Sequence, residues 1–224
     1  MTTSTVDVYG TTRAASETVA ATQGAEVQMN LNQRGDMLVA RALPLYAEYT
    51  RMGNSWCVST PTANAFTYVA AWPTTRAEVV LYNGEAGNGK IYVIDAVWIY
   101  NITSMAAAQP MTLLAQMVPT TGTVPTDNAA ALKRSRSGKV SYNGKARAAI
   151  ANTTAGQTTN LWQVIGTSLV PSPTTNLGAA ILVMLDGKFV VPPGSTFAVN
   201  AVAGTAAGTA IMGISWTEVQ LTTG

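Results

Sequence analysis

Apolar and polar residues alternate along much of the chain in short runs, and a period of two is typical of half-buried β-strands. Turn-forming stretches such as Trp-Pro, Asn-Gly, Asp-Gly and Pro-Pro-Gly separate these runs. We predict strands at 55–59, 65–71, 77–82, 91–100, 111–117, 161–165, 179–185, 195–202 and 209–221. Because no convincing helical period lies between them, they predict an all-β protein, a β-sandwich of two packed sheets.

The segment just before the first of these strands has two possible interpretations. Leu43, Leu45, Ala47 and Tyr49 occupy every second position, which favours a strand. A helix over the same residues would have to accommodate Pro44 near its middle. We therefore predict a strand over 43–50.

The first 34 residues differ from the rest in having few large apolar side chains. A weak helical period over 14–27 lacks the Glu or Gln of a capping box. We predict an extended N-terminal arm, 1–34, followed by a single β-sandwich domain, 35–224. An arm of this composition needs another subunit's surface to become ordered, and the alternative is a frayed end.

The composition narrows the chemistry that the chain can perform. The sequence has no histidine, and Cys57 is its single cysteine. This excludes histidine-dependent nucleophiles and metal sites, internal disulfides and cysteine zinc clusters. The 11 acidic residues are spread singly, although two carboxylates far apart in sequence could still meet as in a glycosidase. Asp95, within an apolar run, is the acid expected to be partly buried. We predict no enzyme activity, no cofactor and no metal.

Nothing at the N-terminus resembles a signal peptide, and no apolar run is long enough to span a bilayer. We therefore expect a soluble protein made in the cytoplasm, with no membrane partner.

The stretch from Gly84 to Lys90 has the spacing of a phosphate-binding loop. Such a loop must open a helix and place a Ser or Thr after the lysine, whereas Lys90 precedes the apolar run Ile91-Tyr-Val-Ile. We predict a hairpin loop instead, with glycines that supply positive φ.

Basic residues cluster in one region that contains no acid. Six of the 13 lysines and arginines lie between 133 and 147, and we predict that they form a partner-contacting basic loop: Lys133, Arg134, Arg136, Lys139, Lys145 and Arg147. Such a loop would steer association with an acidic surface or a polyanion, and the alternative is a solvated loop. The low net charge of +2 and the single aromatic in the run, Tyr142, do not favour nucleic acid.

Four stretches of strand and turn residues then suggest a family. They are Leu43-Pro-Leu-Tyr-Ala-Glu-Tyr-Thr-Arg-Met-Gly53, Leu81-Tyr-Asn-Gly84 leading into Ile91-Tyr-Val-Ile-Asp95, Val191-Pro-Pro-Gly-Ser195, and Gly213-Ile-Ser-Trp-Thr-Glu-Val219. From about Gly35 to Leu221 the chain resembles the jelly-roll-like β-sandwich structural proteins of tailed-bacteriophage virions, of the capsid decoration or cement type.

The resemblance implies a non-enzymatic virion protein, made in the host cytoplasm, that decorates or cements a capsid through protein-protein contacts. Its implied partners are further copies of itself, most often in a homotrimer, and the major capsid protein or other virion proteins.

Two other functions stay open. One is a receptor- or carbohydrate-binding module of a tail or head fibre, in which exposed aromatic rings would stack on sugar faces. The other is a shell-forming jelly-roll capsid protein, which would need contacts on all sides of the subunit. Burial of all five tryptophans would weaken the sugar-binding interpretation. These are Trp56, Trp72, Trp98, Trp162 and Trp216.

Overall fold

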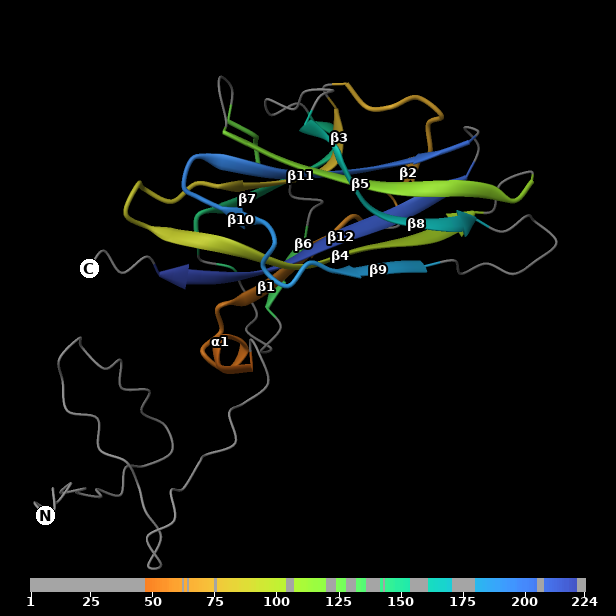
Figure 1. Ribbon diagram of the computed structural model, residues 1–224. Helices are drawn as coiled ribbons and strands as arrows, with labels where there is room; N and C mark the ends of the chain where they lie inside the picture. The colour runs from red at the N-terminus through yellow and green to blue at the C-terminus, as the bar shows by residue number, and fades with distance from the viewer. Residues whose placement is uncertain are drawn as a thin grey trace, which may run out of the picture. The chain divides into compact units, whose positions relative to one another are not determined.

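Two antiparallel sheets pack face to face in the computed structural model of the chain (Figure 1). One sheet has seven strands: β1 (Ser55–Ser59), β2 (Phe66–Thr67), β4 (Lys90–Thr103), β6 (Leu132–Ser135), β9 (Ala180–Met184), β10 (Val190–Val191) and β12 (Thr209–Gln220). The other has five: β3 (Ala77–Asn83), β5 (Gln109–Pro119), β7 (Ala146–Thr153), β8 (Gln163–Val170) and β11 (Ser195–Ala203).

The structure describes residues 47–61, 63, 65–74, 76–103, 107–119, 124–127, 132–135, 142, 144–153, 161–170, 180–204 and 208–220. They belong to one compact unit that begins at Leu45. The predicted arm, 1–34, lies outside the described residues and stays a prediction. No helix in the described ranges is long and apolar enough to cross a membrane.

The strands pair in a nested order. β1 pairs with β12, β3 with β11, β4 with β9, and β5 with β8. The central pairings β12·β4 and β11·β5 join these pairs into the two sheets, and β2, β6, β7 and β10 add to them. Nesting the first principal strand with the last, and so on inward, is the topology of a jelly roll. The predicted all-β sandwich with a jelly-roll-like fold is therefore confirmed.

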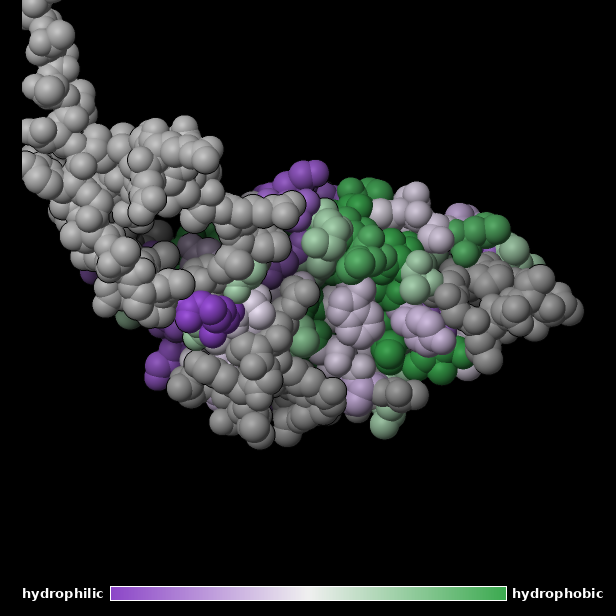
Figure 2. Space-filling model, turned by 90° about the horizontal axis from the view of Figure 1, so that it is seen from below, coloured by the Kyte–Doolittle hydropathy of each residue, from purple (hydrophilic) through white to green (hydrophobic). Residues whose placement is uncertain are grey.

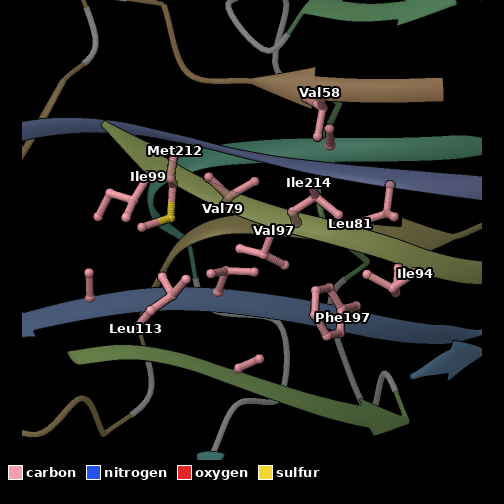
Figure 3. Close-up of a cluster of buried hydrophobic side chains, with 14 of the residues drawn as sticks. Val58, Val79, Leu81, Ile94, Val97, Ile99, Leu113, Phe197, Met212 and Ile214 are labelled. Carbon is pink, nitrogen blue, oxygen red and sulfur yellow. The ribbon is translucent and has the colours of Figure 1, made fainter. Parts of the chain in front are cut away.

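The core lies between the two sheets and consists of the inward side chains of alternating strand positions. Figure 3 shows ten of them labelled, from both sheets. Phe197 and Leu81 among them are fully buried, and so is Trp216 of the same core. Each such side chain contributes about 1.5–3 kcal/mol when it leaves water, so the alternation that predicted the strands also describes the main stabilisation of the fold.

The prediction of a strand over 43–50 is wrong where the structure describes it, because Ala47–Arg51 forms the short helix α1. Gly53 has a φ of 76°. Its N–H donates to the carbonyl of Thr50 (3.0 Å), and the N–H of Asn54 donates to that of Tyr49 (2.8 Å). This is a Schellman cap, in which a glycine in the left-handed region ends a helix. Gly53 is the sequence feature that indicates the end of a helix here, and the alternating pattern before it favoured a strand instead.

Most of the other strand predictions hold. β1, β3, β4, β5, β9, β11 and β12 lie at the predicted segments. The segment 65–71 shortens to β2 and an isolated bridge at Val69, and 161–165 shifts to β8. Three strands were not predicted: β6, β7 and the two-residue β10.

The glycine-rich loop 84–89 connects β3 in one sheet to β4 in the other, so the prediction of a hairpin is wrong. Its glycines do not have positive φ; those that do, in the described ranges, are Gly53, Gly187 and Gly194. Gly84 is needed for a close approach, because a Cβ there would lie 2.6 Å from the backbone oxygen of Lys145. Lys90 begins a strand, as predicted, and not a phosphate-binding helix.

Candidate functional site

Three residues of the predicted basic loop lie on two different strands. Lys133 and Arg134 are on β6, opposite Val58 and Cys57 of β1 in the seven-stranded sheet. Arg147 is on β7 and Lys145 directly precedes it, both exposed, at the edge of the five-stranded sheet. The prediction of a loop is therefore wrong for Lys133, Arg134 and Arg147. Arg136 and Lys139 lie outside the described residues. We call β6 and β7 together the basic edge.

Side chains cap the outer backbone of β7. The N–H of Ala146 donates to the hydroxyl of Tyr142 (2.9 Å), and the N–H of Ala148 donates to Oδ1 of Asp127 (2.9 Å). Both N–H groups belong to alternate residues of an edge strand and face away from β3. Capping satisfies groups that would otherwise be available to another strand. The β7 side of the basic edge is thus blocked as well as charged.

A buried carboxylate anchors this edge to the C-terminal strand. The hydroxyl of Tyr142 donates to Oε1 of Glu218 (2.5 Å), and Nζ of Lys90 lies 3.1 Å from Oε2. Glu218 is only 2% exposed. Burial and the nearby Glu218 charge raise the pKa of Tyr142, and burial raises that of the adjacent Tyr92. No local sequence pattern predicts this group, because its members are far apart along the chain.

Asp95 is buried, as predicted, and its role is structural. It is the extra residue of a β-bulge, since Ser215 and Trp216 on β12 lie opposite Ala96 and Ile94. Thr217 Oγ1 donates to its carboxylate (2.9 Å). The N–H groups of Leu185 and Asp186 donate to its backbone oxygen (2.8 and 3.2 Å). Asp95 therefore fixes the turn that follows β9.

The opposite side of the sandwich, formed by β8 and β9, has no charged residue on either strand; we call it the apolar edge. Several large apolar side chains on or beside it are exposed: Met117, Val164, Leu169, Leu182 and Met184. The two strands approach closely at Gly166, where a Cβ would lie 2.9 Å from Cγ2 of Val183. Exposed apolar side chains that lie close together often mark an interaction site.

A groove of about 450 Å³ opens on the apolar edge. Seven of its nine lining residues have apolar side chains, and Gln163 and Lys188 add polar groups. The lining consists of Met117, Gln163, Val164, Ile165, Val183, Met184, Leu185, Lys188 and Phe189.

The outer face of the seven-stranded sheet carries a second apolar feature. Trp98 lies between Gly213 and Leu182 in the register, and a Cβ on Gly213 would meet its ring at 2.3 Å. The ring therefore lies against the β12 backbone. Tyr100, two residues further along the same face, is 41% exposed. Figure 2, seen from below the view of Figure 1, shows hydrophobic residues gathered across the middle of this face.

The tryptophans divide between core and surface. Trp56, Trp162 and Trp216 are buried, whereas Trp72 is 44% exposed and Trp98 is partly exposed. The criterion that would have weakened sugar binding is therefore not met. In the described ranges no group of three or more Cys, Asp or Glu residues could hold a metal ion.

Comparisons with known proteins add little to this description of the site. No protein-family model and no curated protein sequence matches the chain. Among solved structures, a chain in the cryo-electron microscopy structure of Mud Crab Dicistrovirus aligns over 96% of this chain and 90% of its own length, with 10% sequence identity and a TM-score of 0.19. A TM-score this low does not establish a common fold.

Proposed function

We propose that the chain is a non-enzymatic virion structural protein that decorates or cements a phage capsid through protein-protein contacts, as a homo-oligomer, by resemblance a trimer. The observation that carries the proposal is the exposed apolar surface of this jelly roll, at the apolar edge, whose two strands carry no charge, and on the outer face beside it. Jelly rolls occur in viral capsids and in lectins, so the fold alone does not assign the function. The surface supports a role in contact with other proteins.

The two edges suit two kinds of contact. The apolar edge offers surface whose burial would hold a partner, whereas the basic edge offers charge that steers an acidic surface toward it. A protein that attaches to a preformed shell and also contacts its own copies needs both. In this proposal the basic residues face the capsid, made of the major capsid protein or other virion proteins.

A second function is favoured by one observation. Trp98 and Tyr100 lie on the same outward face of β4 with one side of the indole ring against Gly213. Two partly exposed aromatic side chains on one face of a strand offer a platform on which a sugar could stack. A receptor- or carbohydrate-binding module of a fibre would use such a platform.

Mass spectrometry of purified virions, with copy number per particle, tests the proposal. A copy number of the same order as that of the major capsid protein is expected for a decoration or cement protein. If the chain is itself the most abundant shell component, it is the shell-forming protein. A few copies per particle would favour a fibre or tail module. Absence from purified virions would overturn the proposal.

A further inference from the structure

β9 is an edge strand without the features that normally protect such strands. It pairs with β4 over Ala180–Met184 without a bulge, and no strand in the described part of the chain pairs with its other side. Natural edges carry charges, prolines, bulges or covering groups. The sequence Ala-Ile-Leu-Val-Met contains neither a charge nor a proline.

Five other strands in the described ranges lie at a sheet edge, and each has a protecting feature. β2 and β10 are only two residues long. β8 has a bulge at Ile165, because Gly166 and Val164 lie opposite the consecutive residues Leu113 and Leu114. β7 has the side-chain caps on its outer N–H groups. β6 carries Lys133 and Arg134. The lack of protection is therefore particular to β9.

Both faces of β9 are apolar. Leu182 and Met184 are 65% and 53% exposed on the outer face. Ile181 and Val183, which point the other way, are partly buried against the core. A strand added beside β9 would therefore have apolar neighbours on both of its faces.

We infer that β9 is a self-association edge, which pairs antiparallel with β9 of a second copy and joins the two seven-stranded sheets into one. A two-fold axis at Leu182 places this residue opposite its own equivalent. It also places the small Ala180 opposite the large Met184, and Ile181 opposite Val183, so that side-chain volumes complement each other on both faces. An isologous contact of this kind is closed and joins two copies only.

The chemistry of the edge favours a second copy over a charged partner. Two copies of an uncharged strand meet without like-charge repulsion, whereas an acidic or basic segment would find no opposite charge on β9. The shared edge of five residues is short, about 17 Å, so the pairing is concentration-dependent. It is distinct from the three-fold contacts of the proposed trimer, and with them it would give a hexamer.

This inference deepens the proposed function by naming one surface through which the virion protein would contact its own copies. Its test uses the purified full chain without virions. A chain that does not pair through β9 leaves the virion role standing, and a chain that is absent from virions leaves the pairing standing.

The experiment is sedimentation equilibrium of the full chain over a wide concentration range, with the variant Leu182→Lys. The lysine places two positive charges opposite each other across the two-fold axis, which should weaken pairing by about tenfold or more. The parent should show a mass that doubles with concentration, and the variant should remain at the lower mass. Because Leu182 is exposed, circular dichroism should show the fold unchanged.

The matched control is Leu169→Lys, which changes an equally exposed leucine, 60% exposed, on the bulged strand β8. It should leave the association within about twofold of the parent, since β8 does not pair in the proposed arrangement. Equal weakening by both lysines, or weakening by Leu169→Lys alone, would overturn the assignment to β9. So would a parent mass that does not change with concentration.

Discussion

The two sides of this jelly roll have the same architecture, a pair of edge strands from two sheets, and opposite chemistry. On the basic edge, β7 has its outer N–H groups capped by Tyr142 and Asp127 and is flanked by Lys145. On the apolar edge, β9 is uncharged and carries exposed Leu182 and Met184. The difference shows that each edge strand of one protein can be protected in its own way, or not at all. An unprotected edge points to an interaction surface only when the other edges of the same protein are protected.

The anchoring of the two edges differs in the same way. The basic edge depends on a buried polar group, in which Tyr142 and Lys90 satisfy the carboxylate of Glu218. The apolar edge depends on packing, with Ile165, Ile181 and Val183 partly buried against the core. The stability that a buried polar group provides depends on pH and on each hydrogen-bonding atom. The stability that apolar packing provides depends on the volumes of the side chains. Changes of pH and changes of side-chain volume should therefore affect the two edges differently.

The largest expected effect is loss of stability at alkaline pH. Burial raises the pKa of Tyr142, Tyr92 and Tyr68 above the ordinary 10.0. A pKa that is higher in the folded state gives stability that is complete below pH 10 and is lost as pH rises further. Each tyrosine removes up to about 1.4 kcal/mol per pH unit from the free energy of unfolding, or roughly 4 kcal/mol for the three. Urea unfolding between about pH 9 and about pH 11 measures this slope.

Tyr142→Phe provides the control for this slope. At neutral pH the variant should lose about 2 kcal/mol, because buried Glu218 loses a hydrogen bond from a hydroxyl. Above pH 10 its slope should be about one third smaller than that of the parent. Hydrogen exchange should show β7 opening before β8, since two of the three tyrosines adjoin the basic edge. An unchanged slope, or β8 opening first, would contradict this account.

A smaller effect distinguishes the close approaches at the two edges. In Gly84→Ala the new Cβ would lie 2.6 Å from a backbone oxygen next to β7, which can move only with the strand. In Gly166→Ala the new Cβ would lie 2.9 Å from a methyl group of Val183, which is only partly buried. We expect losses of about 1–3 kcal/mol for Gly84→Ala and about 1 kcal/mol or less for Gly166→Ala. Urea unfolding of both variants measures the difference, and each serves as the control for the other. Equal losses in the free energy of unfolding would mean that the structure around Gly84 can shift as easily as the structure around Gly166.

The smallest expected effect on stability comes from removing charges at the basic edge. Replacing Lys133, Arg134 and Arg136 with serine should change the free energy of unfolding by about 0.5 kcal/mol or less. It should nevertheless slow attachment to capsids from which the protein has been removed, and flatten the salt dependence, because salt screens charges over about 8 Å. Attachment rates at several salt concentrations provide the measurement.

A second variant, Lys145→Ser with Arg147→Ser, divides the basic edge by strand. An effect of the first variant alone would place the contact on the β6 side, and an effect of the second alone would place it on β7. If both variants attach like the parent at every salt concentration, the basic edge is a solvated surface. The N-terminal arm would then be the next region to test.

Strand positions could be predicted wherever large side chains alternate between turn residues, as in β11 and β12. β7 was not predicted because its buried positions are alanines, such as Ala146 and Ala148. Alanine is only weakly apolar, so its alternation with the charged Arg147 did not stand out as a strand pattern. α1 was missed because a five-residue helix contains too little of a 3.6-residue period to compete with alternation, leaving Gly53 as the only mark of its end.

The functional surfaces were harder to predict, for a physical reason. The sequence of β9 is apolar at every position, which is typical of a strand buried on both faces, and only the sheet order shows that it is an edge. The anchor at Glu218 joins residues 76 and 128 positions apart, so no local pattern contains it. The basic residues were visible in the sequence, but their division between two sheets depends on where β6 and β7 pair.

The nested pairing also sets when the protein can fold during its synthesis. β1 lies beside β12, and Ser55 Oγ is 3.2 Å from Thr217 Oγ1, a contact that spans 162 residues. At about 5–20 residues per second, a ribosome takes roughly ten to thirty seconds to make the intervening chain. Until β12 emerges, β1 lacks its partner in the middle of the sheet, and loop-closure entropy slows such long-range pairing further. Completion of the seven-stranded sheet, and assembly through its edge, therefore waits until β12 has left the ribosome.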